Sequence, residues 1–416
     1  MKQEKEKSRR KTWEHPWRYR ESFLVVLELI FLGLIFEVLT GGRGAPMLKW
    51  PVNMFVGAGI LLMLFIIHYR YKSRPMVKWL SSVPAAISAI SFFALVTLLL
   101  GFIKQDDADV NRYLRLLGLT HMKNSWLMMV SGMYFLTTLG LVALRRATPL
   151  RRKNLGFLLN HVGLWITIAA GYLGSGDLMR LDLTVWEGQP STNQAMDKRT
   201  QQVHTLPFAV RLIDFNIEDY NPKLAIMDGR SGKISFEEGK SLPFVEKGLK
   251  TILMNWEVEV LEFEPSAFRK DEAYYRADSI GSAPAAYVKA VNMVSGEETK
   301  GWLSSGSFRV MNQHMPLDNH NFLVMTIPEP EKYSSDILIV NDAQEARPLT
   351  LEVNKPFKYM GWKLYQLSYD ERMGKWSQVS VIEAVRDPWL PMVYLGVFLL
   401  LAGALYLFWI GQDIKE

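Results

Sequence analysis

The 416-residue sequence contains no cysteine. The protein therefore cannot form a disulfide, a thiolate nucleophile, an iron–sulfur site, a CxxC redox pair or a CxxCH haem attachment site. Several enzyme signatures are also absent, namely a Walker A loop, HExxH, GxSxG and the Rossmann glycine fingerprint. These absences exclude thiol exchange and argue against a stand-alone hydrolase or nucleotide-dependent enzyme.

Long apolar runs are what the sequence has instead. Hydrophobic residues make up 49% of the chain, and a run of about 20 of them crosses the ~30 Å hydrocarbon core of a bilayer. We predict membrane helices over residues 22–40, 52–70, 83–103, 125–145, 155–175 and 389–410. The first run ends without a signal-cleavage pattern, so we expect it to be retained. The sequence therefore predicts a polytopic α-helical membrane protein.

Basic residues set the expected orientation. They cluster in the tail 1–21, in the loop around Arg70–Lys78 and in the loop around Arg145–Lys153. The positive-inside rule then places both termini, including residues 411–416, in the cytoplasm, and residues 176–388 outside. In such a protein the net charge of +6 reports topology and does not indicate nucleic-acid binding.

Residues 176–388 are expected to form one large, mainly antiparallel β domain. Strand-like segments lie at 207–215, 256–260, 287–294, 322–327, 362–369 and 379–385. Strict alternation over Trp256–Val260 changes phase at Leu261, which predicts a β-bulge. Many short strands separated by Gly- and Ser-rich turns, without helical patterns between them, favour a sandwich or a barrel-like fold.

One histidine, His161, stands inside a predicted membrane helix. At 1.5 Å per residue it lies about 10 Å beyond the basic cluster Arg151–Lys153. Ionisable side chains are costly there and are functional candidates, and neutral imidazole is a common haem ligand. From position alone, an interhelical hydrogen bond is an equal alternative. His161 shares a helix face with Phe157, Leu164, Trp165 and Ile168.

Other ionisable residues are weaker candidates. His314 and His320 flank Met315 and could ligate haem or copper, but their spacing fits no specific metal motif and a solvated loop is the favoured interpretation. His68 and His121 lie at predicted membrane interfaces, where an anchoring role is the simpler interpretation.

Two glutamates lie within the first predicted helix. Glu28, at mid-helix, should face protein or water and is a candidate for proton handling or a helix contact. Glu37, near the outer end, is expected to snorkel to the interface.

Four stretches of the chain, in order, resemble the ResB (CcsB) family of System II cytochrome c biogenesis. Together they cover roughly residues 80–410. They are 160–171 with 176–179 and 187–189; 206–212 with 215 and 220–222; 353–361 with 364–370; and 385–388 with Gly396 and Gly403.

The resemblance implies a role in the bacterial inner membrane. ResB proteins act with a CcsA-type membrane subunit, move haem b outward and attach it to CxxCH motifs of apocytochrome c. In the family, a histidine at the position of His161 is one axial ligand of haem, and a histidine of the partner is the other. Trp165 would then pack against the porphyrin.

The sequence departs from the family pattern in three places. Two extra helices, within residues 22–70, precede the ResB-like three-helix core at 80–175. The tryptophan-rich haem-handling motif of CcsA is absent, so we expect an accessory subunit rather than an enzyme on its own. Trp186 stands where a basic residue is expected before Glu187.

Three hypotheses follow from the sequence. The leading one is a haem-binding subunit of a cytochrome c haem lyase complex, with His161 as ligand and the β domain as a docking surface. The second is a scaffold that chaperones apocytochrome and does not touch haem. The third is a quinone-linked electron-transfer subunit that uses Glu28 and the two extra helices.

Overall fold

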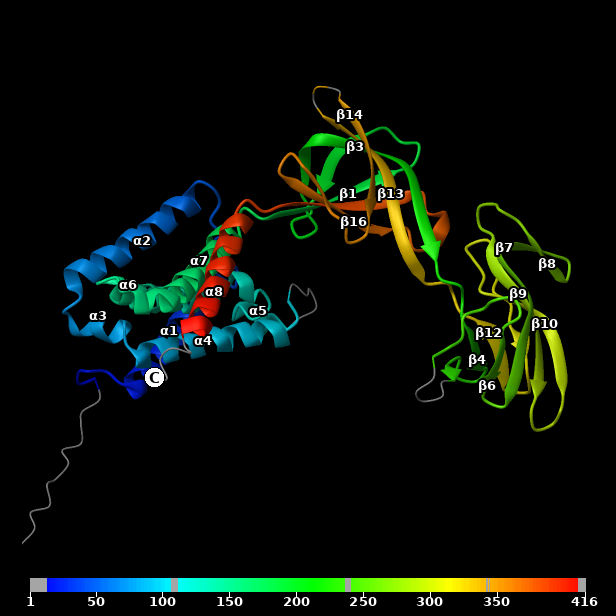
Figure 1. Ribbon diagram of the computed structural model, residues 1–416, viewed down its shortest axis with the longest axis horizontal. Coiled ribbons are helices and arrows are strands. Elements are labelled where there is room, and N and C mark those ends of the chain that lie inside the picture. Colours follow the sequence, from blue (N-terminus) through cyan, green and yellow to red (C-terminus); the bar gives the residue numbers. More distant parts are fainter. Residues whose placement is uncertain (1–12, 106–110, 236–240, 342, 344, 411–416) are drawn as a thin grey trace, which may run out of the picture. The chain divides into compact units, whose positions relative to one another are not determined.

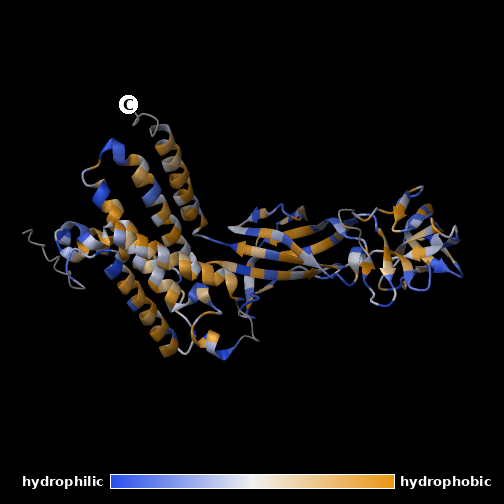
Figure 2. Cartoon of the chain, turned by 90° about the horizontal axis from the view of Figure 1, so that it is seen from below, coloured by the Kyte–Doolittle hydropathy of each residue, from blue (hydrophilic) through white to orange (hydrophobic). Residues whose placement is uncertain are grey.

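The computed structural model describes residues 13–105, 111–235, 241–341, 343 and 345–410. The chain divides into two compact units. One, here called the membrane unit, comprises Met1–Leu178 and Asp387–Glu416; the other, the β unit, comprises Met179–Arg386. Figure 1 traces both along the sequence, and in Figure 2 the helical part is predominantly apolar.

Six helices of the described chain are long and apolar enough to span a membrane, which confirms the predicted fold class. They are α1 (Tyr19–Leu39), α2 (Val52–Tyr71), α4 (Val83–Phe102), α6 (Trp126–Ala147), α7 (Leu155–Gly174) and α8 (Leu390–Ile410). The short helices α3 (Pro75–Leu80) and α5 (Arg112–Leu116) lie in connections. Helix α1 begins three residues before the predicted start because the backbone N–H of Arg18 donates to Glu21 Oε2, at 2.8 Å, in a capping box.

Helix α6 lies at the centre of the membrane unit. In α6, 67% of the apolar, membrane-crossing stretch is buried, against 11% in α8. Helices α1, α2, α4 and α7 all contact α6. Helices α1, α2, α4 and α7 thus surround α6, while α7 also packs against α8 and α1 against α4 (Figure 1).

Helices α7 and α8 pack closely through glycines. A Cβ at Gly163 would lie 2.6 Å from the carbonyl oxygen of Gly396, and a Cβ at Gly403 would lie 2.8 Å from the backbone nitrogen of Asn160. Only glycine allows two helix backbones to approach so closely. These glycines belong to the stretches that resemble ResB, so those stretches include the residues at which α7 and α8 cross.

The described part of the β unit contains three sheets, and every described pairing of named strands is antiparallel. The largest has the order β14-β13-β3-β2-β1-β17-β16-β15. Its strands are β1 (Met179–Trp186), β2 (Thr192–Met196), β3 (Val203–Asp219), β13 (Pro330–Asn341), β14 (Ala346–Glu352), β15 (Phe357–Tyr359), β16 (Trp362–Tyr369) and β17 (Val379–Arg386).

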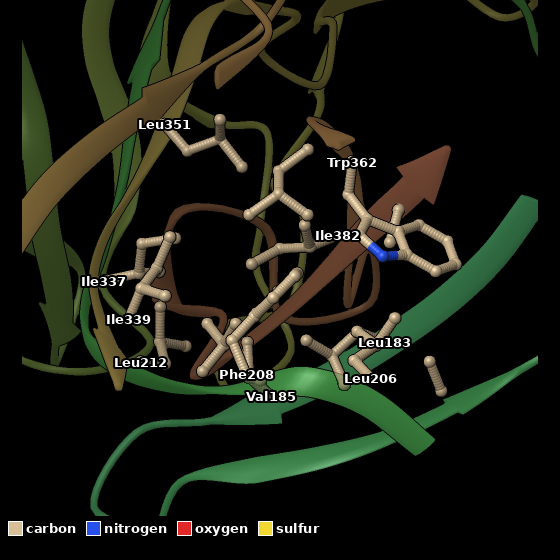
Figure 3. Packing of buried hydrophobic residues seen from close by; sticks show 14 of the residues in the cluster. Leu183, Val185, Leu206, Phe208, Leu212, Ile337, Ile339, Leu351, Trp362 and Ile382 are labelled. Atoms are coloured by element: carbon tan, nitrogen blue, oxygen red, sulfur yellow. The ribbon is translucent and has the colours of Figure 1, made fainter. Parts of the chain in front are cut away.

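This eight-stranded sheet curls around its own core. Strand β14, at one edge, contacts β16, next to the other edge. Figure 3 shows Phe208 of β3, Ile339 of β13 and Trp362 of β16 pointing into one interior, where each is at most 5% exposed. The expected barrel-like curvature is therefore present in this half of the β unit.

The other two sheets share a second core. One contains β6 (Lys250–Leu253), β7 (Trp256–Lys270), β8 (Ala273–Arg276), β9 (Ala283–Asn292) and β10 (Glu298–Ser304). The other contains β4 (Leu224–Asp228), β5 (Ile234–Ser235), β11 (Met315–Pro316) and β12 (Asn321–Met325). Side chains such as Val258, Val288 and Leu323 meet between them. The predicted bulge is confirmed, because the register of β7 against β9 shifts between Val260 and Glu262.

Candidate functional site

The imidazole of His161 is held by its own helix. Its Nδ1 lies 2.9 Å from the carbonyl oxygen of Phe157, one turn earlier on α7. A carbonyl oxygen can only accept, so Nδ1 carries the hydrogen and Nε2 keeps its lone pair. Within the described chain, Nε2 has no hydrogen-bond partner. This is the tautomer in which histidine commonly ligates a metal, with the other ring nitrogen bonded to a carbonyl.

The ring of Phe157 fixes the imidazole further. The two rings stack with centroids 3.6 Å apart and an interplanar angle of 21°. The guanidinium of Arg146, from the end of α6, lies 5.3 Å from the centroid of Phe157 on its ring face. The half-buried His161 is therefore oriented by a backbone hydrogen bond and a stack before any ligand arrives.

Trp165 follows one turn later on the same stripe of α7. Its indole N–H donates to the carbonyl oxygen of Leu136 on α6, at 3.0 Å. Tyr172, two turns further, donates to the carbonyl oxygen of Met128, at 3.0 Å. These two bonds fix the rotation of α7 against α6, and with it the direction of His161. Both side chains also line a cavity of about 150 Å³ between α2, α6 and α7.

Asp177, just beyond α7, joins three segments and was not singled out from the sequence. Its carboxylate accepts from the backbone N–H of Trp50, the side-chain amide of Asn53 and the indole of Trp389, at 2.8, 2.7 and 2.8 Å. Burial alone raises the pKa of this carboxyl, but those hydrogen bonds together hold it below its ordinary value. The start of α2, the end of α7 and the start of α8 are therefore fastened together. Asp177 stands in a stretch that resembles ResB, which was the available signal.

The prediction that Glu37 snorkels is wrong. The residue is 0% exposed. Its carboxylate accepts from the backbone N–H of Gly44 and of Trp126, at 2.9 and 2.8 Å, and Oε1 lies 2.9 Å from Nε2 of His121. Gly118 leaves the space, since a Cβ there would lie 2.6 Å from the carboxyl carbon. Three hydrogen-bond donors therefore offset the desolvation free energy of the Glu37 carboxylate. His121 is one of these donors, and this contact takes the place of the interfacial anchoring expected for it.

Glu28, by contrast, lies on the exposed side of α1. Its neighbours on that side are apolar and exposed, among them Phe31 and Ile35. Within the described chain no hydrogen bond or ion pair engages its carboxylate.

His314 and His320 lie in the β unit without an assembled ligand set. Nε2 of His320 lies 2.9 Å from the guanidinium of Arg230, which can only donate, so its lone pair is occupied. His314 is half-buried just before β11. Among the residues that the structure describes, no group of three or more His, Cys, Asp or Glu could hold a metal ion. Ligation by these two histidines stays a prediction.

The β unit carries a pocket of about 680 Å³ that sequence reasoning missed. It is formed by loops and by parts of strands that are distant in sequence, such as β3, β7 and β16, so no periodic pattern marks it. Asp219 and Lys375 line it; burial raises the pKa of Asp219 and lowers the pKa of Lys375, and their mutual attraction opposes both shifts. Met311 and Ile327, also lining it, are 87% and 76% exposed. The pocket thus combines an apolar rim with a charged wall.

The architecture and site define a helical membrane protein with an antiparallel β unit and, inside a membrane helix, a histidine whose Nε2 has no hydrogen-bond partner in the described chain. A model of the ResB-like family matches residues 280–378, within the β unit. No curated protein matches the chain. The family match bears out the resemblance to ResB proteins over residues 280–378, which include the stretch 353–370, and suggests a membrane subunit of cytochrome c biogenesis. The stretch that contains His161 lies outside the matched residues.

Proposed function

We propose that the protein is the haem-holding membrane subunit of a cytochrome c haem lyase complex. The observation that carries this proposal is the hydrogen bond from Nδ1 of His161 to the Phe157 carbonyl, which presents a free Nε2 within a membrane helix. Haem b is the cargo, and this nitrogen would be one of its two axial ligands. The second ligand would come from a CcsA-type partner.

The residues around His161 supply orientation rather than chemistry. Phe157 stacks on the imidazole, and Trp165 ties α7 to α6. Apolar helices exclude water from the iron and so favour neutral ligands. The chain lacks the tryptophan-rich haem-handling motif of CcsA proteins. We therefore assign thioether formation to the partner and the apocytochrome, and we do not propose this chain as an enzyme on its own.

The orientation of the chain is part of the proposal. Basic residues near the starts of α1 and α7 and the ends of α2 and α6 support an orientation in a bacterial inner membrane with both termini on the cytoplasmic side. The β unit then lies outside, where apocytochrome c is found. It would receive the polypeptide while the membrane unit holds the haem.

The test is the haem content of the complex purified with its CcsA-type partner. We expect His161→Ala to lose most of the bound haem while the complex assembles normally. His204→Gln is the control, since it changes a half-buried histidine in strand β3 of the β unit, and it should keep the wild-type haem content. Equal haem in all three complexes would contradict the proposal.

A second candidate is the scaffold without haem, and the pocket in the β unit favours it. Met311 and Ile327 offer exposed apolar side chains beside a charged wall, as a surface for an extended polypeptide would. We expect the double variant Met311→Ser/Ile327→Ser to weaken apocytochrome binding about tenfold or more, since each side chain is worth ~1 kcal/mol or more when buried. Val294→Ser is the control, because Val294 is 83% exposed on the same unit and does not line the pocket. The scaffold candidate alone predicts this loss together with a silent His161→Ala.

A further inference from the structure

A small basic pocket lies where α2, α3 and α6 meet, at the ends of α2 and α6 that carry the basic residues. Its volume is about 190 Å³. It is lined by His68, Lys72, Val77, Lys78, Ser81, Leu141, Arg145 and Thr148. The lining therefore includes three cations, a histidine and two hydroxyl groups, and no carboxylate.

The three cations converge without a described counter-ion. Within the described residues, no salt bridge engages Lys72, Lys78 or Arg145. Arg145 uses only Nη1, which donates to the carbonyl and hydroxyl oxygens of Ser81 at 3.4 and 3.3 Å. A guanidinium has five N–H donors, so most of them stay available. Like charges held around one hollow repel each other, and an anion between them would relieve that repulsion.

His68 adds a built element to the pocket. It is 7% exposed, and its Nε2 lies 3.4 Å from the hydroxyl of Thr148. That hydroxyl already donates to the carbonyl oxygen of Leu144, at 2.9 Å, so it accepts from His68. The histidine thereby ties α2 to the end of α6 and closes one side of the pocket.

Helix ends alone do not explain this arrangement. Cations are favoured near helix C-termini and on the cytoplasmic side of membrane proteins. Those effects place basic residues anywhere along the rim, as at Arg151 and Lys153. All five of these basic residues are exposed, but Arg151 and Lys153 line none of the described pockets, whereas Lys72, Lys78 and Arg145 line this one. Those effects do not require three cations to face one concave site with hydroxyl groups between them.

We propose that this pocket binds the phosphate of an anionic phospholipid. Basic pockets between membrane helices are suited to such headgroups. The volume suits a phosphate with its glycerol and is too small for a tetrapyrrole. Val77 and Leu141 make part of the wall apolar, and the neighbouring Tyr69 and Met76 are 59% and 54% exposed. Acyl chains would continue along the exposed apolar side chains of α2, such as Phe65 and Leu62, which favours a lipid over a free anion.

The test compares two double variants of the full chain in detergent, titrated with phosphatidylglycerol and followed by native mass spectrometry. Lys72→Gln/Lys78→Gln removes two pocket charges. Arg151→Gln/Lys153→Gln removes two charges outside it and is the matched control. The loss of general surface attraction should weaken phosphatidylglycerol binding about fivefold for each charge removed, and equally in both double variants. We expect the pocket variant to bind phosphatidylglycerol at least tenfold more weakly than the control variant, and both to bind phosphatidylcholine equally.

Two results would overturn the proposal. Equal losses in the two double variants would reduce the effect to surface attraction. Displacement of phosphatidylglycerol by an equal concentration of inorganic phosphate would show a free-anion site that does not recognise lipid. Arg145 is left unchanged because it also binds Ser81, and the near-identical melting temperatures expected for both variants separate binding from folding.

Discussion

At the scale of single residues, the membrane unit depends on polar side chains whose partners are distant in sequence. Glu37 and Asp177 each accept several hydrogen bonds from other segments, and His161 donates to its own helix. In an apolar medium an unpaired polar group costs several kcal/mol. The carboxylates of Glu37 and Asp177 are fully paired, whereas Nε2 of His161 has no partner in the described chain. This contrast separates the structural acids from the candidate ligand.

The buried Glu37 gives a prediction about stability. Glu37→Gln replaces one acceptor oxygen with an amide that meets the N–H of Gly44 or Trp126, so we expect a loss of about 2–3 kcal/mol in the free energy of unfolding. Glu28→Gln on the same helix is the control and should stay within ~0.5 kcal/mol, because Glu28 is exposed. Thermal unfolding in detergent measures both. Equal effects would contradict the buried network.

Glu28→Gln also tests the quinone-linked hypothesis. If the protein holds haem through His161, quinol-dependent reduction of the purified complex is expected to be the same in wild type and Glu28→Gln. A clear change in the rate of that reduction, with wild-type stability, would support a redox role for the exposed carboxylate instead.

Asp177 gives a prediction about pH. The hydrogen bonds from Trp50, Asn53 and Trp389 lower its folded-state pKa below the ordinary 3.8. A depressed carboxyl pKa contributes stability above the unfolded-state pKa, and this contribution is lost as pH falls through the folded-state value. Asp177→Asn should therefore cost about 1–2 kcal/mol at pH 7, and the difference from wild type should shrink below about pH 4. Melting temperatures measured from pH 3 to 7 test this; a constant difference would contradict it.

At the scale of elements, local sequence patterns were enough to predict those helices and strands whose formation depends on neighbouring residues of the chain. Apolar length predicted all six membrane helices, and alternation with a change of phase predicted the β7 bulge. The short helix α3 was not predicted, because a six-residue segment between two membrane helices has no distinctive periodicity.

The crossing of α7 and α8 gives a matched pair of glycine variants. A Cβ at Gly163 meets the backbone of α8, whereas a Cβ at Gly171, on the same helix, meets nothing within 4 Å. We expect Gly163→Ala to destabilise the protein by about 1–3 kcal/mol. Gly171→Ala should be neutral or slightly stabilising, since alanine is the better helix former. Unfolding of the two variants in detergent compares them, and similar melting temperatures would contradict the close packing.

At the scale of the whole molecule, the sequence predicted membrane helices and a β domain, but it did not predict the contacts between segments that are distant in sequence. Strand β1 pairs with β17, and Asp177 binds Trp389, although each pair is separated by most of the β unit in sequence. Such long-range pairing leaves no periodic signal. The same reason hid the pocket of the β unit, whose lining comes from loops and strands distant in sequence. It also led to the wrong expectation for Glu37, whose partners Gly44, His121 and Trp126 come from two loops and a helix start.

The central claim is that His161 ligates haem, and its most direct test is an absorption spectrum. The complex with the CcsA-type partner would be reduced and measured as wild type, as His161→Ala, and as His161→Ala with added imidazole. The proposal predicts sharp bands for low-spin haem in the wild type, their loss or broadening in the variant, and their recovery with imidazole. Identical spectra and haem content in the wild type and the variant, with intact assembly, would contradict it.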